Sequence, residues 1–436
     1  MMVEGLMIAI SSDPRVRGRY TMDVSLKRPK LRWPLEVRMV PLESGEGDQS
    51  ESQAILMQCP LGISSQPLLL VPAVGPLLSA FDGEHSVEEI LAQFASQGLQ
   101  RSTLDELITL LDAHLFLAGP RFFAAERESV EGFRSLSIRP AALAGSAYPS
   151  AEADLRSLVD GLLVTPSSEL KRGELKCLVA PHIDYRRGGR CYGQIYPYLA
   201  NSDADTFILI GTSHQYSRQM FHLSAKDFES PLGRLPCNAE FVSALATRFG
   251  TERAFRDEYL HRREHSLELQ LPFISRVRPG ARIVPILVGS FHEALESGKK
   301  LDRFDEYTAF VGACAEAIQK ERREGRRVCF IAGVDMAHVG RNFGDESALT
   351  PDFMEFVAER DKRYLQAIQA HDTAALFAHV AEDQDARRIC GFPTMHTVLD
   401  IFEKLDDRVV CEVTRYDQAV DYQSDCAVTF AGLALV

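Results

Sequence analysis

The amino-acid sequence predicts an α/β protein with a mostly parallel central sheet, helices on both faces of that sheet, and a small N-terminal module. Two observations favour this fold. From residue 133 onward, short apolar runs alternate with amphipathic helical segments, which is typical of a parallel sheet covered by helices. Before residue 133, two short helical patterns accompany a separate strand pattern, which indicates a separate module. We therefore expect a loosely ordered lead-in over residues 1–30, a winged-helix-like module over 31–132 and the α/β domain over 133–436.

Hydrophobic periodicity places the elements of the larger domain. Apolar runs predict its strands at residues 177–180, 206–210, 283–288, 328–334 and 426–435. Helical periodicity predicts its helices at residues 152–163, 189–199, 239–249, 306–324, 352–370, 373–380 and 394–405. No internal repeat is visible.

The N-terminal module carries signals for a strand and for two helices. Residues 35–40 form a strand candidate. Ser86 and Glu89 have the spacing of a capping box before an amphipathic run, and Thr103 and Glu106 repeat that spacing. The pattern is similar to the small peptide-binding winged helices that accompany radical-SAM peptide-modifying enzymes. A helical cap that packs on the main domain fits the same pattern equally well.

The composition excludes some classes of function. A formal net charge of -13 argues against a nucleic-acid-binding protein, because such proteins carry an excess of Lys and Arg. The longest apolar stretch, residues 67–81, contains Pro72 and Pro76 and is too short for a membrane-spanning helix. The sequence shows no secretory signal, and its nine cysteines include no CxxC pair, which indicates reduced thiols and a cytoplasmic location.

Histidines follow three of the predicted strands. His182, His214 and His338 each lie a few residues beyond the end of an apolar run, and Asp335 precedes the last of them. In an open α/β sheet, ligands bind outside the carboxyl ends of the parallel strands, so neighbouring strands would bring these side chains to one edge. Imidazole is a common ligand of iron, zinc and copper. A single histidine in such a place is more often structural, but three at equivalent positions favour a functional site.

One further segment combines a histidine with carboxylates, namely Glu264, His265 and Glu268. His265 and Glu268 are three residues apart, so they share a face if the segment is helical. A carboxylate beside an imidazole orients the ring or exchanges a proton with it. Glutamates at the start of a helix are also favoured by the helix dipole alone, and this alternative stays open.

Cys390 differs from the other cysteines in its setting. It precedes Gly391 and Pro393, which indicate a turn and the start of a helix, and a helix N-terminus favours the thiolate form of cysteine. A thiolate serves as a metal ligand or as a nucleophile. A hydrolase has less support, because Cys390 and His396 are separated by a turn and Ser213 lacks the GxSxG elbow.

Eight short motifs occur in order along residues 138–436. They are Ala144-Gly-Ser-Ala-Tyr148, Ala180-Pro-His-Ile-Asp-Tyr185, Ile208-Leu-Ile-Gly-Thr-Ser-His214, Glu264-His-Ser-Leu-Glu268, Val284-Pro-Ile-Leu-Val-Gly289, Asp335-Met-Ala-His338, Ile389-Cys-Gly391 and Ala431-Gly-Leu-Ala434. Each motif is weak alone. Together they resemble the Memo family, whose prokaryotic members are called AmmeMemoRadiSam system protein B.

This resemblance implies a fold related to the class III extradiol ring-cleavage dioxygenases, which use non-haem iron. It implies that His182, His214 and Cys390 hold a divalent transition metal, with iron expected and copper or zinc as alternatives. Other residues of the same motifs are expected to line the cleft. They are Asp335, His338 and His265, with roles in proton transfer or in orienting ligands, and Asp184, Tyr185, Ser213, Glu264 and Glu268.

The family name reflects a genomic association with an AMMECR-type protein and a radical-SAM enzyme, so the resemblance implies both as partners. The sequence departs from the family pattern at Ala147, Gln215 and Gln270, where the family usually has an aromatic residue and two histidines. The three ligand positions are kept, so the resemblance still implies metal binding. The departures weaken the expectation of the proton transfer that ring cleavage requires.

Two functions fit the sequence. The first is a redox-active metal protein in which Cys390 replaces the carboxylate of the facial triad of non-haem iron enzymes. A diol and O₂ would then occupy the open metal positions, and His265 or His338 would move protons. A soft thiolate ligand favours copper, zinc or a lower-potential iron over ring cleavage. The second is a binding or adaptor protein, in which the cleft and the N-terminal module recognise a small molecule, a peptide or a partner protein.

Overall fold

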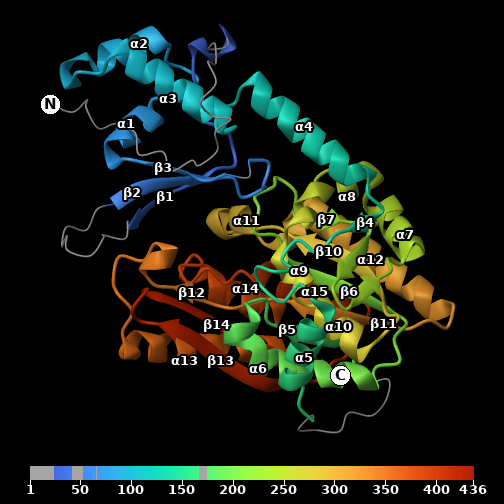
Figure 1. Cartoon of the computed structure of the whole chain (residues 1–436). Helices are drawn as coiled ribbons and strands as arrows, with labels where there is room; N and C mark the ends of the chain where they lie inside the picture. Colours follow the sequence, from blue (N-terminus) through green and yellow to red (C-terminus); the bar gives the residue numbers. More distant parts are fainter. Residues whose placement is uncertain (1–23, 42–52, 65, 166–173) are drawn as a thin grey trace. The chain divides into compact units, whose positions relative to one another are not determined.

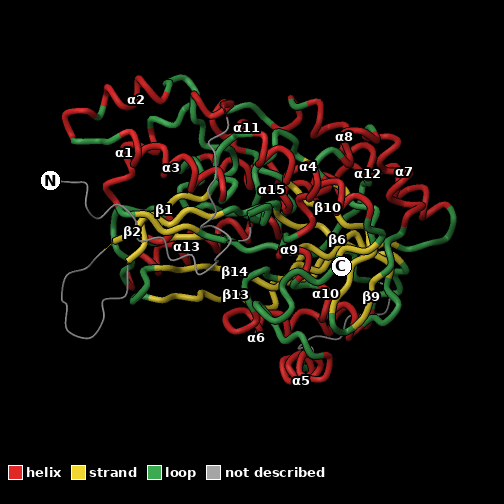
Figure 2. The backbone as a smooth tube through the Cα atoms, turned by 45° about the horizontal axis from the view of Figure 1, so that its top comes forward, coloured by secondary structure: helices red, strands yellow, loops and turns green. Residues whose placement is uncertain are grey.

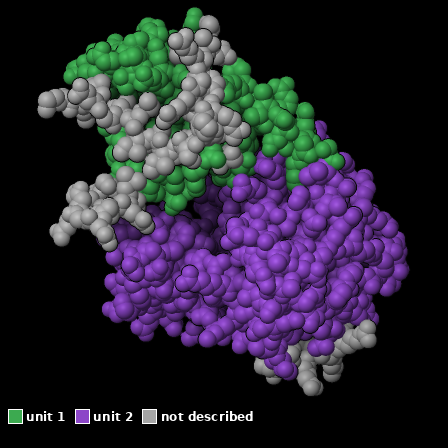
Figure 3. Space-filling model, in the orientation of Figure 1, with its two compact units in different colours: residues 1–135 green, residues 136–436 purple. Residues whose placement is uncertain are grey.

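The computed structural model of the chain describes residues 24–41, 53–64, 66–165 and 174–436. The chain divides into two compact units, residues 1–135 and 136–436 (Figure 3). Each unit has a hydrophobic core of its own. Within the described ranges, no helix is both long enough and apolar enough to cross a membrane.

The first unit contains an antiparallel sheet of three strands in the order β1-β2-β3, followed by helices. The strands are β1 (Glu36–Pro41), β2 (Gln53–Gln58) and β3 (Leu68–Leu70). The helices are α1 (Gly75–Ser79), α2 (Val87–Gln93), α3 (Arg101–Ala113) and α4 (Pro120–Ser135), with short 3₁₀ turns at Pro72–Val74 and Ala95–Gln97. In this part of the described chain every strand precedes every α-helix. The predicted winged-helix arrangement, with strands on either side of two helices, is therefore not confirmed.

The ends of the helices in this unit show which local signals were correct. Ser86 caps α2, because its hydroxyl accepts from the backbone N–H of Glu89 while the Glu89 carboxylate accepts from the backbone N–H of Ser86. The predicted capping box is therefore confirmed at this helix. At α3 the predicted box is wrong, since the helix starts at Arg101, before Thr103. Arg101 forms an ion pair with Asp105, four residues on, which stabilises this earlier first turn.

The predicted lead-in lies mostly outside the described residues, which begin at residue 24. Its last part has regular structure: Val24–Lys27 forms a 3₁₀ turn, and Lys30 pairs with Asp82 through an isolated β-bridge. Leu26 lies in the core of the first unit, where it packs with side chains of the helices. Residues 24–30 thus contain some regular structure, whereas the rest of the predicted lead-in lies outside the described residues.

The second unit is built around an eight-stranded mixed sheet with the order β12-β14-β5-β11-β6-β10-β7 and with β13 beside β14 (Figure 1). Its strands are β5 (Cys177–Ala180), β6 (Thr206–Thr212), β7 (Phe221–Leu223), β10 (Arg282–Val288), β11 (Val328–Gly333), β12 (His338–Val339), β13 (Cys411–Asp421) and β14 (Cys426–Leu435). Only β5, β11, β6 and β10 are mutually parallel. The expectation of a mostly parallel sheet is corrected to a mixed sheet, because the β13–β14 hairpin returns the chain antiparallel to β5.

Helices cover both faces of this sheet, as predicted (Figure 2). The period-two alternation of β6 shows why: Phe207 and Leu209 pack into one core, whereas Ile208 and Ile210 pack into the other. One core includes side chains of α5 (Glu152–Leu162), α6 (Tyr185–Ile195) and α10 (Leu271–Val277). The other includes side chains of α7 (Ala239–Phe249), α12 (Asp305–Arg323), α13 (Pro351–Gln369), α14 (Thr373–Ala381) and α15 (Phe392–Lys404).

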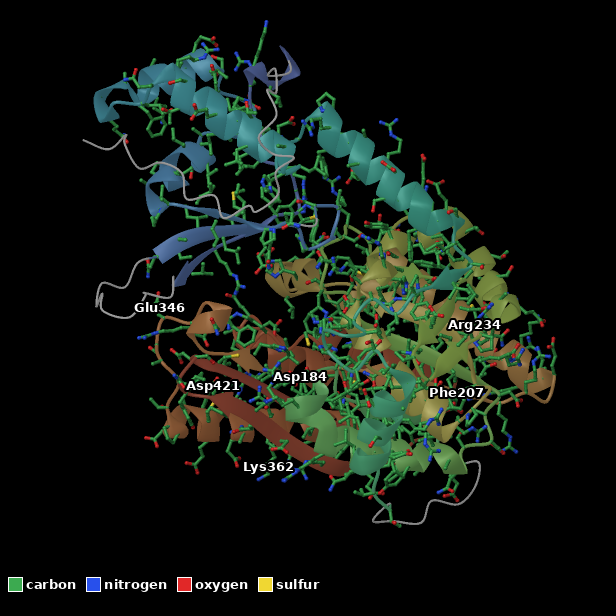
Figure 4. All side chains as sticks on the ribbon, in the orientation of Figure 1. Asp184, Phe207, Arg234, Glu346, Lys362 and Asp421 are labelled. Carbon is green, nitrogen blue, oxygen red and sulfur yellow. The ribbon has the colours of Figure 1, made fainter. Side chains whose placement is uncertain are left out.

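Shorter elements fill the connections of the second unit. They are α8 (Thr251–Phe255), α9 (His265–Glu268), α11 (His292–Ser297) and a small sheet of β4 (Ile138–Arg139), β8 (Asp227–Ser230) and β9 (Gly233–Leu235). The helix predicted at residues 189–199 begins earlier, because the Asp184 side chain caps α6 by accepting from the backbone N–H of Arg187. Figure 4 labels Asp184 at this end of α6. The same helix gives way to a 3₁₀ turn at Tyr196–Asn201, which contains Pro197.

Candidate metal centre

Three parallel strands bring the predicted site residues to one edge of the sheet. β5, β11 and β6 are neighbours, and Gly333 at the end of β11 is in register with both Ala180 and Gly211. The three strand ends are therefore level. His182 and His214 follow the outer two of these strands. This is the arrangement in which open α/β sheets bind ligands.

Cys390 reaches the same edge from the turn before α15. Its Sγ lies 3.3 Å from Nε2 of His182. One potential ligand atom from each of His182, His214 and Cys390 lies within 4.8 Å of the others, so the three could hold one metal ion. The backbone around Cys390 is fixed by Thr212, whose hydroxyl donates to the Cys390 carbonyl at 2.8 Å. Thr212 was not among the predicted site residues, and the residues around it in the sequence give no signal for this contact.

Both histidines are held in the tautomer that leaves Nε2 free for a metal. Nδ1 of His182 lies 3.0 Å from the carbonyl oxygen of Gly333, and Nδ1 of His214 lies 2.9 Å from a carboxylate oxygen of Glu264. Because both of these oxygens only accept, each Nδ1 carries the proton. Histidine ligands in proteins are commonly oriented in this way by an acceptor behind the ring. The donor set of two Nε2 atoms and one sulfur therefore fits a divalent transition metal.

Burial and neighbouring charges set the protonation of the ligands. Burial, together with the charges of His214 and His265, lowers the pKa of His182 well below its usual range, so its ring is neutral and able to ligate. Desolvation and the nearby Asp335 carboxylate raise the pKa of the Cys390 thiol well above its usual range. The sequence favoured a thiolate at the start of a helix, but in this protein desolvation outweighs the helix dipole. Cys390 is therefore a thiol, and a metal ion that binds it must displace the thiol proton.

Glu264 is the carboxylate at the centre of the cluster. It accepts from the backbone N–H of His214 at 2.9 Å and from that of Ser266 at 3.0 Å, and it lies 3.2 Å from Nδ1 of His265. Burial acts to raise the pKa of Glu264, but the charges of His214 and His265 and their hydrogen bonds lower it well below its usual range. Burial acts to lower the pKa of His265, but its hydrogen bond to Glu264 raises it. Glu264, His214 and His265 form a second group that could hold a metal ion.

The cluster has a buried floor and an accessible mouth. The side chain of His182 is 1% exposed, whereas those of His214 and His265 are 30% and 39% exposed. The rings of His214 and His265 stack with their centroids 4.3 Å apart, and His182 meets both edge-on. A ligand therefore reaches the site from the side of His214 and His265.

Asp335 and His338 lie around the site on the segment that follows β11. One oxygen of the Asp335 carboxylate accepts from the backbone N–H of His182 at 2.9 Å, and the other lies 3.7 Å from Nε2 of that residue. Burial raises the pKa of Asp335 to about 7. Nδ1 of His338 lies 3.1 Å from the carbonyl of Met336, and burial and the charge of His214 lower the pKa of His338 to about 4. His338 belongs to neither potential metal-binding group among the described residues.

Two predicted cleft residues on α6 have structural contacts. Asp184 is the N-cap of this helix and forms an ion pair with Arg187. Tyr185 is buried, and its hydroxyl donates to the carbonyl of Leu269. Ser213 donates to the carbonyl of Gln215 in the loop after β6.

Glu268 differs most from its predicted role. Its buried carboxylate forms an ion pair with Arg139 and accepts from the Tyr148 hydroxyl and from the backbone N–H groups of Ala142 and Leu143. The proposed pairing of His265 with Glu268 on one helical face is therefore corrected, because the carboxylate beside His265 is that of Glu264. α9 is a single turn, too short for the spacing alone to decide which carboxylate meets the ring.

Two glycines allow the backbone to close around the cluster. A Cβ atom on Gly333 would lie 2.2 Å from the carbonyl oxygen of Ser266, and one on Gly391 would lie 2.4 Å from that of Asp335. No side chain fits at either position without moving the backbone. The sequence shows both glycines, but only the structure shows that they bring α9 and Cys390 close to the strand ends.

The hydrolase hypothesis gains no support from these contacts. His396 does not face Cys390; its Nδ1 lies 2.8 Å from the Tyr307 hydroxyl and 3.3 Å from the Asp400 carboxylate. The imidazole that Cys390 does meet, His182, has a lowered pKa, and the thiol pKa is raised. Both shifts oppose the thiolate–imidazolium pair that a cysteine nucleophile needs.

Fold and site together define a mixed α/β protein with a His/His/Cys cluster at the carboxyl ends of its parallel strands. The family model for Memo-like proteins matches residues 139–434. The chain therefore belongs to the Memo-like protein family, as the motifs predicted.

Relatives in bacteria and archaea support this assignment. The chain is 26% identical over 389 residues to a MEMO1 family protein of Aquifex aeolicus, covering 88% of this chain and 96% of the relative. It is 32% identical over 201 residues to a MEMO1 family protein of Archaeoglobus fulgidus, covering 46% and 68%. A MEMO1 family protein of Thermus thermophilus is 25% identical over 316 residues, covering 71% and 87%. The Aquifex match covers more of the chain than the Memo-like region alone.

Proposed function

We propose that this protein binds one divalent transition metal ion through His182, His214 and Cys390 and uses it in redox chemistry. The observation that carries the proposal is the convergence of one potential ligand atom each from His182, His214 and Cys390, all within 4.8 Å of one another, at level strand ends. The Nδ1 atoms of both histidines are already engaged by acceptors, so the rings need no reorientation to ligate. Three protein ligands leave open positions for a substrate, as at catalytic rather than structural sites.

The donor set narrows the choice of metal. Imidazole suits iron, copper and zinc, and a thiolate favours softer or lower-potential ions over magnesium or calcium. We propose iron as the resident metal, with copper and zinc as the alternatives that metal analysis separates. When bound, the metal supplies Lewis acidity and, for iron or copper, electron transfer.

The surrounding residues have distinct roles in this proposal. Cys390 gives up its thiol proton when it ligates, since the thiolate is the ligating form. Glu264 fixes the orientation of His214, and its hydrogen bond to His265 raises the pKa of that ring, which favours the protonated form that could donate a proton to a substrate at the mouth of the site. Asp335, with a pKa of about 7, can exchange a proton beside His182 near neutral pH.

Elemental analysis of protein purified without an affinity tag tests this proposal. We expect close to one equivalent of iron, copper or zinc in the unaltered chain, and loss of that metal in His182→Ala and in Cys390→Ser. Cys426→Ser is the matched control, because Cys426 is also a free, half-buried cysteine but lies outside the cluster. Full metal content in Cys390→Ser, or no retained metal in the unaltered chain, contradicts the proposal.

We infer a second candidate function, recognition of a partner protein, from the first unit. This unit has its own core and lies outside the Memo-like region at residues 139–434. Its strand β1 pairs only with β2 among the described residues and has Val37 and Met39 about half exposed, at 47% and 48%. A strand with one unpaired edge is a common site for adding an extended peptide. By the family association, an AMMECR-type protein and a radical-SAM enzyme are the partners proposed.

Binding of purified AMMECR-type and radical-SAM proteins to two variants of the full chain separates the two functions. Val37→Asp with Met39→Asp alters only the first unit, and His182→Ala with Cys390→Ser alters only the metal cluster. Partner recognition by the first unit predicts that the first variant alone loses binding. Equal binding by both variants and by the unaltered chain contradicts this second function.

A further inference from the structure

A separate cavity of about 1080 Å³ lies in the second unit between α12, α14 and α15. Gly298, Lys300, Leu301 and Asp302, which precede α12, also line it. None of its lining residues belongs to the cluster of His182, His214 and Cys390. The cavity is large enough for a small organic molecule, since ligand pockets commonly span about 300–1,000 Å³.

The cavity exists because the facing helices carry small residues where larger ones would fill the space. Gly312 of α12 and Ala374, Ala378 and Ala381 of α14 line it. A Cβ atom on Gly312 would have no neighbouring atom within 4 Å, which shows that the space beside this glycine is open. Val311 and Phe377 supply apolar walls. An occupant therefore needs an apolar body.

One wall of the cavity carries a buried hydrogen-bonded network. The Tyr307 hydroxyl lies 2.6 Å from a carboxylate oxygen of Asp400 and 2.8 Å from Nδ1 of His396. Since the carboxylate only accepts, the hydroxyl donates to it and accepts from the His396 ring. Tyr307 is 2% exposed, and the side chains of His396 and Asp400 are 7% and 20% exposed. Burial acts to raise the pKa of Asp400, but the hydrogen bond and charge of His396 lower it, so Asp400 is ionised.

The charges that face the cavity are predominantly negative. The acidic residues are Asp302, Glu382, Asp400 and Glu403, and the basic ones are Lys300, Lys404 and the titratable His396. Glu382 is engaged by Arg360 at 2.7 Å, and Asp302 lies 3.6 Å from the Arg303 guanidinium. The two remaining carboxylates, Asp400 and Glu403, lie on one helix of the cavity wall. They are three residues apart in the last turns of α15, where the helix dipole also favours a cation.

We propose that this cavity is a binding site for a small organic cation, a protonated amine on an aromatic or alkyl body. The ammonium group would lie toward Asp400 and Glu403, and the apolar body would pack against Val311 and Phe377. A carboxylate accepts up to about four hydrogen bonds, so Asp400 can accept from an ammonium group in addition to its contacts with Tyr307 and His396. An aromatic ring such as that of Phe377 also attracts a cation placed over its face.

Three probes of equal size and different charge test the proposal on the full chain at neutral pH. They are benzylamine, benzyl alcohol and benzoate, with affinities measured by isothermal titration calorimetry. We expect benzylamine to bind about tenfold or more tightly than benzyl alcohol, because a charge-assisted hydrogen bond replaces a neutral one, and benzoate to show no binding. Benzyl alcohol or benzoate binding as tightly as benzylamine overturns the proposal.

Two variants locate the binding. Asp400→Asn keeps an acceptor for the Tyr307 hydroxyl but removes the charge, so the affinity for benzylamine should fall to that for benzyl alcohol. Gly312→Leu places a side chain in the open space and should abolish binding of both probes. Glu316→Gln, on the outer face of α12, is the control and should change neither affinity. Unchanged benzylamine binding by folded Gly312→Leu protein overturns the proposal, even if Asp400→Asn fails to fold.

Discussion

The carboxylate of Glu264 holds His214 by two of its groups, the ring Nδ1 and the backbone N–H, each at 2.9 Å. This double contact fixes both the position of the residue and the tautomer of its ring. It leaves Nε2 of His214 without a role in this contact, and one potential ligand atom of His214 lies within 4.8 Å of those of His182 and Cys390. The carboxylate is buried, with its side chain 2% exposed, so water does not compete for these hydrogen bonds.

Removing the charge of Glu264 should weaken metal binding without removing a ligand. Glu264→Gln keeps the shape of the side chain but can turn an amide N–H toward His214 and disfavour the ligating tautomer. Loss of such an outer partner typically lowers metal affinity about 10–100-fold. Competition with a chromophoric chelator measures the effect. Glu293→Gln, on α11, is the control, and an unchanged affinity in Glu264→Gln would show that the contact does not orient the ligand.

Gly391 should be required for the position of Cys390. In Gly391→Ala, the new Cβ would lie 2.4 Å from the Asp335 carbonyl and 2.7 Å from Cβ of Val334, so the turn must move. We expect lower metal content and lower thermal stability, measured by elemental analysis and by calorimetry. Gly161→Ala, where a Cβ meets nothing within 4 Å in α5, should keep full metal content and be slightly more stable. Equal behaviour of the two variants contradicts this account.

The ion pair between Arg139 and Glu268 should stabilise the fold and not the chemistry. Both side chains are fully buried, so Glu268→Ala leaves an uncompensated guanidinium in the core. Breaking such a pair from one side costs about 3–5 kcal/mol. We expect a large fall in the urea concentration at which half of the protein is unfolded. The side chain of Glu252 is 90% exposed, so Glu252→Ala should leave that concentration nearly unchanged. Metal content that falls while that concentration is kept would place Glu268 in the site instead.

Two buried histidines should make the protein sensitive to acid. Burial lowers the pKa of His222 to about 4 and that of His261 to about 3, against about 6.5 in the unfolded chain. The unfolded state therefore binds more protons below pH 6.5. The contribution of these histidines to the free energy of unfolding is fully present above pH 6.5. It falls as the pH drops toward 4, by up to about 1.4 kcal/mol per pH unit for each histidine.

His222→Leu tests this pH dependence. Neither ring nitrogen of His222 has a hydrogen-bond partner among the described residues, so an apolar replacement leaves no acceptor or donor unpaired on this side chain. Melting temperatures at pH 7.5 and pH 5 should differ less in this variant than in the unaltered chain. An unchanged difference would assign the acid sensitivity to other groups.

Much of the site followed from local sequence patterns. β5, β6 and β11 are short, largely apolar runs, and the polar residues after them lie where such strands end. Because parallel neighbours end at one edge, the sequence alone places His182 and His214 together. Cys390 was placed there by the family resemblance, since nothing in its local pattern relates it to these strands.

Other features depend on contacts that local patterns do not contain. β13 was not predicted, because its residues are nearly all half-buried and show no apolar alternation; its position follows from pairing with β14. Glu264 rather than Glu268 is the partner of His265, because Arg139, from a distant part of the sequence, forms an ion pair with Glu268. The raised pKa of Cys390 likewise depends on how closely the surrounding residues exclude water.

X-ray absorption spectroscopy of the zinc-loaded full chain tests the central claim most directly, because it counts ligands without requiring activity. A site formed by His182, His214 and Cys390 predicts about one sulfur neighbour near ~2.3 Å and about two imidazole nitrogens near ~2.0–2.1 Å. The sulfur neighbour should vanish in Cys390→Ser and persist in Cys426→Ser. A spectrum of the unaltered protein with no sulfur neighbour, or one that Cys390→Ser leaves unchanged, would contradict the proposed metal centre.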